Sequence, residues 1–263
     1  MLTSYSKKRY AYVKENFEKL YPSVNQKEFG TSTFGEKLLY ISAAIVNIYC
    51  LYSTIIIMSS YSSICNMITM LIAYVVGDIA SGFVHWLPDS YDVHPFLLET
   101  PVLSTFGNIL QESFDGFRMH HIKPYTIVTH TIFNTCGSTF IFVAFVQMFL
   151  RLIIPCNYFI ALVGIISTLN IFSNEFHKIS HMSNDQMMVI QKIINKTNIF
   201  LTKDRHRSHH IFESEVQGYT MLSGLFNPFL DRPDVRFWER LEYVMFYLFG
   251  IKSFRMINKE LNE

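Results

Sequence analysis

Four apolar stretches of about twenty residues each constrain the fold of this 263-residue chain more than any other feature. They run over 38–58, 64–84, 132–154 and 158–176. A helix that crosses a bilayer needs about 20 apolar residues, and helices are one of the two structures that satisfy their backbone hydrogen bonds inside lipid. Only 16% of the chain is charged, whereas about 25% is usual in soluble domains. We therefore expect an all-α, multi-span integral membrane protein with about four transmembrane helices.

The four stretches divide the chain into a membrane domain and two tails. We expect an N-terminal tail over 1–36, a membrane domain over 37–250 and a C-terminal tail over 251–263. The N-terminal tail is polar and has no early apolar core, so it does not predict a signal peptide. Within the membrane domain, 185–200 is amphipathic and suits a helix along the membrane interface. The segment 234–249 also predicts a helix.

The positions of lysine and arginine predict which way the spans run. With four spans, both termini lie on one side of the membrane, together with the loop between the second and third spans. All 22 lysines and arginines except Arg151 lie before the first span, in this loop or after the fourth span. Because such residues favour the cytoplasmic side, we expect the termini and this loop in the cytosol, at the endoplasmic reticulum if the source is eukaryotic. The net charge of +1 gives no electrostatic case for a nucleic-acid partner.

Histidines gather at the same predicted side of the membrane. Nine of the ten fall into four groups, each at or beyond the cytosolic end of a span. The groups are His85; His120, His121 and His130; His177 and His181; and His206, His209 and His210. Imidazole is a favoured ligand of transition metals, and one metal needs only three or four protein ligands. The sequence therefore predicts a histidine-rich cytosolic cap that binds two metals.

The spacing within the groups suits helices. His177 and His181 are four residues apart, and the group that begins at His206 follows the spacing i, i+3, i+4, so each set shares one helix face. By contrast, the adjacent His120 and His121 point in different directions on a helix and can serve two metals.

The all-histidine composition of the predicted site favours iron over zinc. The H-E-x-x-H pattern of zinc proteases is absent from the sequence. Surplus histidines beside a membrane fit iron that activates O2. Two irons with O2 give an oxidant able to remove hydrogen from an unactivated C–H bond, while the protein supplies ligands, orientation and exclusion of water.

Carboxylates near the histidines are candidates for a supporting role. Asp78 lies inside the second span, where a carboxylate is costly to bury. It is seven residues before His85 and either serves the metal site or makes a structural hydrogen bond. Asp89 is placed to accept the second N–H of an imidazole. Further acidic candidates precede the histidine groups: Glu112, Asp115 and Glu175.

Two basic residues flank the histidines of the middle loop. Arg118 and Lys123 are candidates for binding a phosphate head group, although the preference of positive residues for the cytosolic side explains them equally well.

Five stretches carry a resemblance to a known family. They are D-I-A-S-G-F-V-H-W-L-P-D-S (78–90), F-R-M-H-H-I-K-P-Y-T-I-V-T-H (117–130), N-E-F-H-K-I-S-H (174–181), H-R-S-H-H (206–210) and F-W-E-R-L-E (237–242). On these stretches the chain resembles the Kua/CarF plasmanylethanolamine desaturases, with a plant plastid desaturase acting on phosphatidylglycerol as a more distant relative. The chain departs from the family pattern at Thr131, Asn134 and Glu175, and these changes concern substrate choice rather than the metal site.

The resemblance implies a reaction and its cofactors. Such an enzyme uses two iron ions, O2 and electrons from a cytochrome b5-type donor. It converts a 1-O-alkyl ether phospholipid to the 1-O-alk-1'-enyl plasmalogen. The histidines that match the family's motifs are implied as catalytic iron ligands: His85, His120, His121, His177, His181, His206, His209 and His210. His130 is implied as a further metal ligand.

Two other functions remain open from the sequence. One is a fatty acyl or other lipid desaturase or hydroxylase that uses the same type of metal site. The other is a membrane metal-binding or adaptor protein without enzymatic activity.

Overall fold

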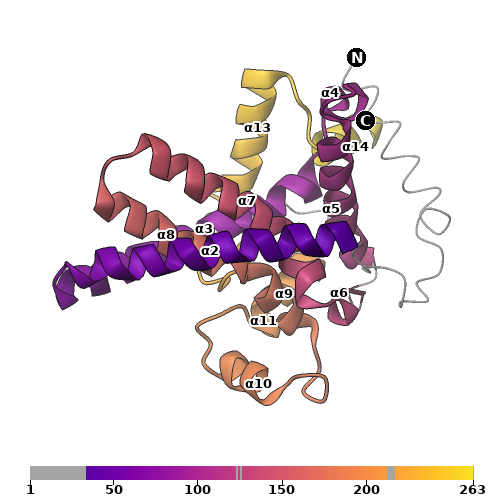
Figure 1. The fold of residues 1–263 in the computed structure, drawn as a ribbon. Helices are drawn as coiled ribbons and strands as arrows, with labels where there is room; N and C mark the ends of the chain where they lie inside the picture. Colours follow the sequence, from indigo (N-terminus) through magenta and orange to yellow (C-terminus); the bar gives the residue numbers. More distant parts are fainter. Residues whose placement is uncertain (1–33, 123, 125, 212–216, 263) are drawn as a thin grey trace.

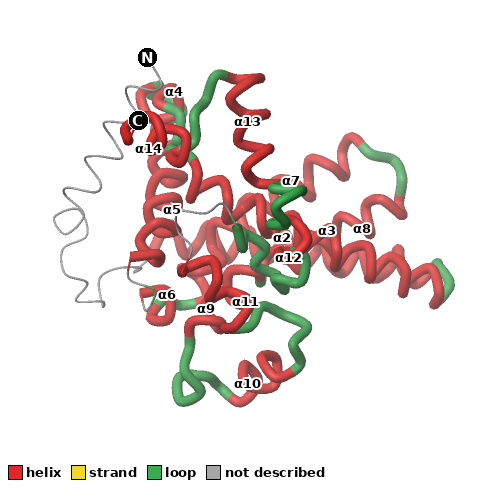
Figure 2. The backbone as a smooth tube through the Cα atoms, turned by 180° about the vertical axis from the view of Figure 1, so that it is seen from behind, coloured by secondary structure: helices red, strands yellow, loops and turns green. Residues whose placement is uncertain are grey.

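The computed structural model describes residues 34–262 apart from 123, 125 and 212–216, so nearly all of the expected N-terminal tail lies outside the described residues. Throughout the described part, the secondary structure is helical and no strand is present (Figure 2). Four of its helices are long and apolar enough to cross a membrane, by length and composition. The expected all-α, four-span architecture is therefore confirmed.

The four spans form one bundle. They are α2 (Phe34–Ser59), α3 (Ser63–Ser90), α7 (Ile132–Ile153) and α8 (Asn157–Ile171), which continues through a break at Phe172 into α9 (Ser173–His181). Helix α2 packs against α7 and α8, and α3 packs against α8. In Figure 1 the α7–α8 turn and the C-terminal end of α2 lie at one end of the bundle, and α5, α9 and α11 lie toward the other.

Helix α3 is longer than the apolar stretch that predicted it. The side chain of Ser62 caps its start by accepting the Cys65 N–H. At the other end, the helix continues from Val84 to Ser90. The extension carries His85 and Asp89, which share one face because they are four residues apart. One helix thus both spans the bundle and delivers polar side chains at its end.

The remaining helices are shorter and lie around the histidine-bearing end of the bundle. They are α4 (Pro95–Glu99), α5 (Ser104–Ile122), α6 (Thr126–Thr129), α10 (Val189–Lys196), α11 (Lys203–Ile211), α12 (Asn227–Leu230), α13 (Phe237–Phe249) and α14 (Phe254–Asn262). Helices α10 and α13 lie in the two predicted amphipathic segments, and α13 runs across the direction of the spans (Figure 1). The expected C-terminal tail carries α14, and Arg255 at its start pairs with the buried Glu242 of α13.

Glycines let α2 approach its neighbours closely. A Cβ atom on Gly164 of α8 would lie 2.1 Å from Oγ1 of Thr54 in α2. A Cβ on Gly137 of α7 would lie 2.7 Å from the ring of Tyr40, also in α2. Small residues at such contacts let helices pack closely inside a membrane, where lipid removes the hydrophobic driving force for their association.

Buried polar side chains also join α2 to α7. The Asn47 amide donates to the backbone oxygen of Phe140 over 2.9 Å, and its own oxygen accepts from Gln147 over 3.0 Å. One turn further along, Arg151 donates to the Cys50 backbone oxygen and to the Ser53 hydroxyl. These bonds fix the register of α2 along α7.

Replacing Gly164 by alanine is expected to destabilise the bundle. The added methyl group has no room beside Thr54, and overpacking of this kind costs about 1–3 kcal/mol. The matched control is Gly116→Ala in α5, where a Cβ meets no atom within 4 Å and where alanine gains up to about 1 kcal/mol of helix propensity. Thermal unfolding of both variants in detergent measures the difference. Equal melting temperatures would contradict the close α2–α8 contact.

Candidate metal centre

Polar side chains that are candidates for metal binding converge into two groups beside the spans. In each group, one ligand atom per residue lies within 4.8 Å of all the others. The first, the five-histidine group, consists of His120, His177, His181, His206 and His210. The second, the Asp89 group, consists of His85, Asp89, His121 and His209. Eight of the nine histidines singled out from the sequence are thus brought together.

Helix geometry explains how four helices build two groups. Pairs spaced i, i+4 enter the same group: His177 with His181 from α9, and His85 with Asp89 from α3. Adjacent histidines separate, because neighbouring residues on a helix point in different directions. On α5, His120 enters the five-histidine group and His121 the Asp89 group, and α11 divides His209 and His210 in the same way. Each adjacent pair thus contributes one histidine to each group.

The Asp89 group has the dimensions of a metal site. Its Nε2 atoms are separated by 3.0 Å between His85 and His209 and by 3.3 Å between His209 and His121. Oδ2 of Asp89 lies 3.0–3.5 Å from these three nitrogens. Ligands held about 2.0–2.2 Å from one ion stand roughly 2.8–3.6 Å apart at octahedral or tetrahedral angles. The distances therefore fit one ion bound by three imidazoles and a carboxylate.

The five-histidine group is equally compact. Successive Nε2 atoms lie 3.2 Å apart from His177 to His181, 2.9 Å from His181 to His206, and 2.8 Å from His206 to His210. Nε2 of His120 is buried and makes no hydrogen bond with the described residues. A neutral imidazole has only one N–H, so each ring whose proton is on Nδ1 turns an Nε2 lone pair toward its neighbours. A bound cation would satisfy them.

The two groups adjoin each other. Across their boundary, ring centroids lie 4.3 Å apart between His120 and His121, and 4.9 Å apart between His121 and His210. On the side that faces the bundle, the ring centroids of His85 and His177 lie 5.0 Å apart. The arrangement suits a site with two neighbouring ions.

Burial favours the neutral form of three histidines outside the spans. It lowers the pKa of His120, His206 and His210 below the ordinary value of about 6.5, because a charged imidazole loses its hydration there. Neighbouring imidazoles lower these pKa values further, since a second positive charge would be repelled. The neutral form is the one that binds a metal.

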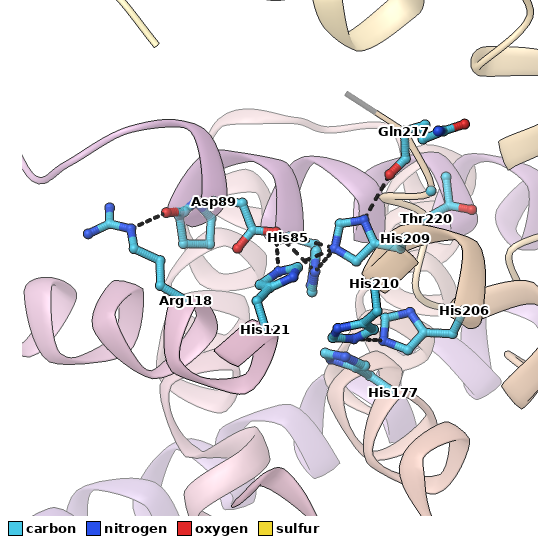
Figure 3. A network of polar contacts seen from close by, with 12 residues as sticks. His85, Asp89, Arg118, His121, His177, His206, His209, His210, Gln217 and Thr220 are labelled. Atoms are coloured by element: carbon cyan, nitrogen blue, oxygen red, sulfur yellow. Dashed lines mark hydrogen bonds and ion pairs between the residues drawn. The ribbon is translucent and has the colours of Figure 1, made fainter. Parts of the chain in front are cut away.

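A backbone carbonyl orients His209. Its Nδ1–H donates to the oxygen of Gln217 over 2.8 Å (Figure 3). This bond places the proton on Nδ1 and leaves the lone pair on Nε2, which faces His85 and His121 in the Asp89 group. Metal-binding histidines are commonly fixed in this way.

Asp78 supports the loop that supplies this carbonyl. Its Oδ1 accepts the backbone N–H groups of Ser223 (2.6 Å) and Gly224 (3.2 Å), and its Oδ2 accepts that of Phe226 (3.4 Å). One helical turn along α3, Oγ of Ser81 accepts two more N–H groups of the same loop. Of the two roles that the sequence left open for Asp78, the structure shows the structural hydrogen bond, and Asp78 belongs to neither group.

Asp89 and His130 differ most from the sequence analysis. Asp89 was expected to orient an imidazole, whereas its carboxylate oxygen is itself a member of a group. The i, i+4 spacing to His85 was the signal for this. His130 belongs to neither group. Its backbone oxygen accepts a hydrogen bond from Lys178 over 3.0 Å, and its buried Nε2 makes no hydrogen bond with the described residues.

Arg118, one of the two candidates for head-group binding, is not placed for that role by the structure. The guanidinium of Arg118 donates to Asp92, Asp115 and the backbone oxygens of Pro88 and Tyr91, so its donors are used inside the protein. Lys123 lies outside the described residues, and the side chain of Glu112 is likewise not described.

The remaining acidic candidates enter neither group: Asp115 pairs with Arg118, and Glu175 stands beside the five-histidine group. It pairs with Lys178 over 3.0 Å and accepts the hydroxyl of Thr135 over 3.1 Å. Sequence reasoning did not find Gln217 or Ser81, because backbone carbonyls and a lone serine carry no spacing signal.

A comparison with protein families identifies the group of proteins to which this site belongs. Residues 74–255, which contain every member of both histidine groups, match the family model described as the lipid desaturase domain. The chain belongs to this lipid desaturase family. The resemblance to plasmanylethanolamine desaturases is thereby confirmed at the level of the family.

The curated relatives of this chain carry two kinds of name. Plasmanylethanolamine desaturase of Myxococcus xanthus is 31% identical over 145 residues, 54% of this chain and 47% of the relative. Plasmanylethanolamine desaturase 1 of Mus musculus is 25% identical over 190 residues, 67% of this chain and 64% of the relative. Fatty acid desaturase 4, chloroplastic, of Arabidopsis thaliana is 25% identical over 179 residues, 68% of this chain and 51% of the relative. The chain thus spans about half the length of the Myxococcus and Arabidopsis proteins. No solved structure matches.

Metal analysis of double variants tests whether each of the two groups binds one ion. Replacing His177 and His181 by alanine removes two ligands from the five-histidine group alone, and replacing His85 and Asp89 does so for the Asp89 group. Each double variant is expected to retain about one of two ions, as measured by mass spectrometry of the purified protein. His130→Ala is the control and should retain both. Loss of an ion from this control would make His130 a ligand.

Replacing Asp78 by alanine is expected to lower the stability of the fold rather than to remove a metal ligand. Three backbone N–H groups lose their acceptor, and each unsatisfied buried group costs about 1–3 kcal/mol. Thermal unfolding in detergent measures the loss. Asp185→Ala removes an exposed aspartate and should change nothing. A variant at Asp78 that melts like the wild type but loses an ion would instead place Asp78 in metal binding.

Proposed function

We propose that this chain is an O2-dependent lipid desaturase that converts a 1-O-alkyl ether phospholipid to its 1-O-alk-1'-enyl plasmalogen. Its five-histidine group and its Asp89 group would hold two iron ions. The observation that carries the proposal is the pair of adjoining, buried ligand groups at one end of four apolar helices. Membership of the lipid desaturase family supports the reaction type, and the names of the Myxococcus and mouse relatives support the substrate.

The position of the groups suits a lipid substrate. Members of both groups lie at the ends of helices long enough to cross a membrane, namely His85 on α3 and His181 at the end of the α8–α9 run. A phospholipid would keep its head group at the interface while the first carbons of its chain reach the groups. We place this end of the bundle in the cytosol, because lysine and arginine are concentrated there, and in the endoplasmic reticulum of a eukaryotic cell.

The overall reaction sets what the site must supply. The substrate loses one hydrogen from C1 and one from C2 of the alkyl chain. Together with two electrons and two protons, these reduce O2 to two molecules of water. Bound iron supplies the oxidant for breaking the C–H bonds, and a cytochrome b5-type protein is the proposed source of the electrons.

The chain's own residues hold and shield the site in this reaction. Nε2 atoms of the histidines and Oδ2 of Asp89 would hold the ions, and the Gln217 carbonyl would keep His209 in the required tautomer. His85, His177 and His206 are at most 2% exposed, so the surrounding helices exclude water from the reacting bond.

A fatty acyl desaturase with the same metal site is the second candidate. The Arabidopsis relative, which is named a fatty acid desaturase, matches this chain as closely as the mouse plasmanylethanolamine desaturase does. A metal-binding protein without enzymatic activity is the third, and the absence of O2 consumption by the iron-loaded protein would support it.

Lipid analysis of a host without plasmalogens, supplied with an alkyl ether lipid, tests the proposal. The wild type is expected to produce acid-labile vinyl ethers, measured by mass spectrometry before and after acid treatment. His181→Ala and His210→Ala should abolish them, because each removes a ligand of the five-histidine group. The matched control is His94→Ala, since His94 is an exposed histidine that caps α4.

Three outcomes would count against the proposed reaction. Altered acyl chains without vinyl ethers would favour the second candidate. Vinyl ether formation by His210→Ala at the wild-type level would contradict the role of the histidine group. A wild type that binds iron and changes no lipid would favour the third candidate.

A further inference from the structure

One peptide unit beside the Asp89 group is held from both of its ends. It joins Gln217 to Gly218. Its carbonyl oxygen accepts the Nδ1–H of His209 over 2.8 Å, and its N–H donates to Oδ2 of Asp231 over 2.9 Å. A carboxylate, a peptide and an imidazole thus form one chain of hydrogen bonds that ends at a candidate metal ligand (Figure 3 shows its Gln217–His209 end).

We propose that Asp231 is a positioning residue that acts on His209 through this peptide unit. The proposal rests on the proposed function in one respect, that His209 binds a metal ion. Metal-binding histidines commonly donate their second N–H directly to a carboxylate or a carbonyl. Here the carbonyl is the direct partner, and the carboxylate stands behind it. Because hydrogen bonds in a chain polarise one another, the charge of Asp231 makes the carbonyl a stronger acceptor and His209 a stronger ligand.

The surroundings of Asp231 favour this role. It directly follows α12, and its own N–H is held by the oxygen of Asn227 over 2.9 Å. The side chain of Asn227 in turn accepts the N–H of Thr220 over 2.9 Å, so α12 is attached twice to the loop that carries the peptide unit. The carboxylate therefore has a fixed position relative to His209.

The charge of Asp231 has no competing partner among the described side chains. Neither a lysine nor an arginine pairs with it there, and its second oxygen is buried without a hydrogen bond. Burial raises its pKa to about 6, which still leaves the carboxylate charged near neutral pH. Its one described side-chain hydrogen bond is the bond to the Gly218 N–H. The effect of the charge is therefore directed along the hydrogen bonds from Asp231 through the peptide unit to His209, which we call the relay.

Gly218 allows the peptide unit to come close to His209. Its φ of +79° lies in the left-handed region that favours glycine. A Cβ atom at this position would also lie 2.9 Å from Cβ of His209. The glycine is thus required for the geometry, whereas Asp231 contributes a charge that the geometry alone does not need. This difference can be tested.

The test compares Asp231→Asn with Asp231→Ala in the full-length, metal-free chain. Asparagine keeps an oxygen that accepts the Gly218 N–H but removes the charge, and alanine removes both. Cobalt(II) is the probe, and competition with a coloured chelator measures the affinity of each site. We expect one of two sites to weaken about 10–100-fold in Asp231→Ala and less in Asp231→Asn, with the other site unchanged. Asp234→Asn removes an exposed charge that pairs with Arg232 and should have no effect.

A second measurement is independent of metal and of activity. In metal-free protein labelled with 15N-histidine, the nitrogen shifts report which ring nitrogen of His209 carries the proton. The wild type should show the Nδ1–H tautomer, and Asp231→Ala should show a mixture. A thermal melt of Asp231→Asn should match that of the wild type, because the charge rather than the fold is changed.

The outcomes separate this proposal from the proposed function. Wild-type cobalt affinity and an unchanged tautomer in both variants would overturn the relay, even in an active desaturase. An equal loss at both sites, accompanied by a lower melting temperature, would also overturn it, because Asp231 would then be only structural. If the relay results hold but no vinyl ether forms in cells, the proposed reaction fails and the relay stands.

Discussion

Buried polar atoms need partners, and this requirement governs the histidine-bearing end of the molecule. Nine ligand atoms are gathered in two groups, several of them almost fully buried, where an unpaired polar group costs free energy. Imidazoles facing one another at about 3 Å cannot all pair among themselves, since each neutral ring has one N–H to donate. A bound cation would resolve this for the ring nitrogens that face inward. Several other polar contacts of this region hold those rings in place.

The loop after α11 shows how the candidate ligands are held. Seven of its N–H groups between Gly218 and Phe226 are accepted by the side chains of Asp231, Asn227, Ser81 and Asp78. Two of these acceptors belong to α3, the helix that also carries His85 and Asp89. The histidines of α11 are therefore positioned against those of α3 through the backbone of this loop. A substitution on α3 well inside the bundle can alter a ligand on α11 without contacting it.

Periodicity made the bundle and most of the site predictable from the sequence. Apolar stretches gave the four spans, and the i, i+4 spacing placed His177 with His181 on one face. Helical direction also separated His120 from His121. The sequence could not assign the roles of Asp78 and Asp89, because both are acidic residues near His85 and only the tertiary structure shows which atoms each one meets. His130 looked like the other histidines, and its separation from the groups depends on α6 and Lys178, which no local pattern encodes.

The length of α3 bears on the depth of the Asp89 group in a bilayer. A helix rises about 1.5 Å per residue, so His85 lies about 33 Å along α3 from its first residue, Ser63. The hydrocarbon core of a bilayer is about 30 Å thick. With Ser63 at the far boundary of the core, the Asp89 group stands level with the near boundary, where a phospholipid chain has only its first carbons. Such a depth would suit the proposed bond next to the ether oxygen better than one in the middle of an acyl chain. In this way, the number of residues between Ser63 and His85 would set which carbon atoms lie nearest to the proposed metal site.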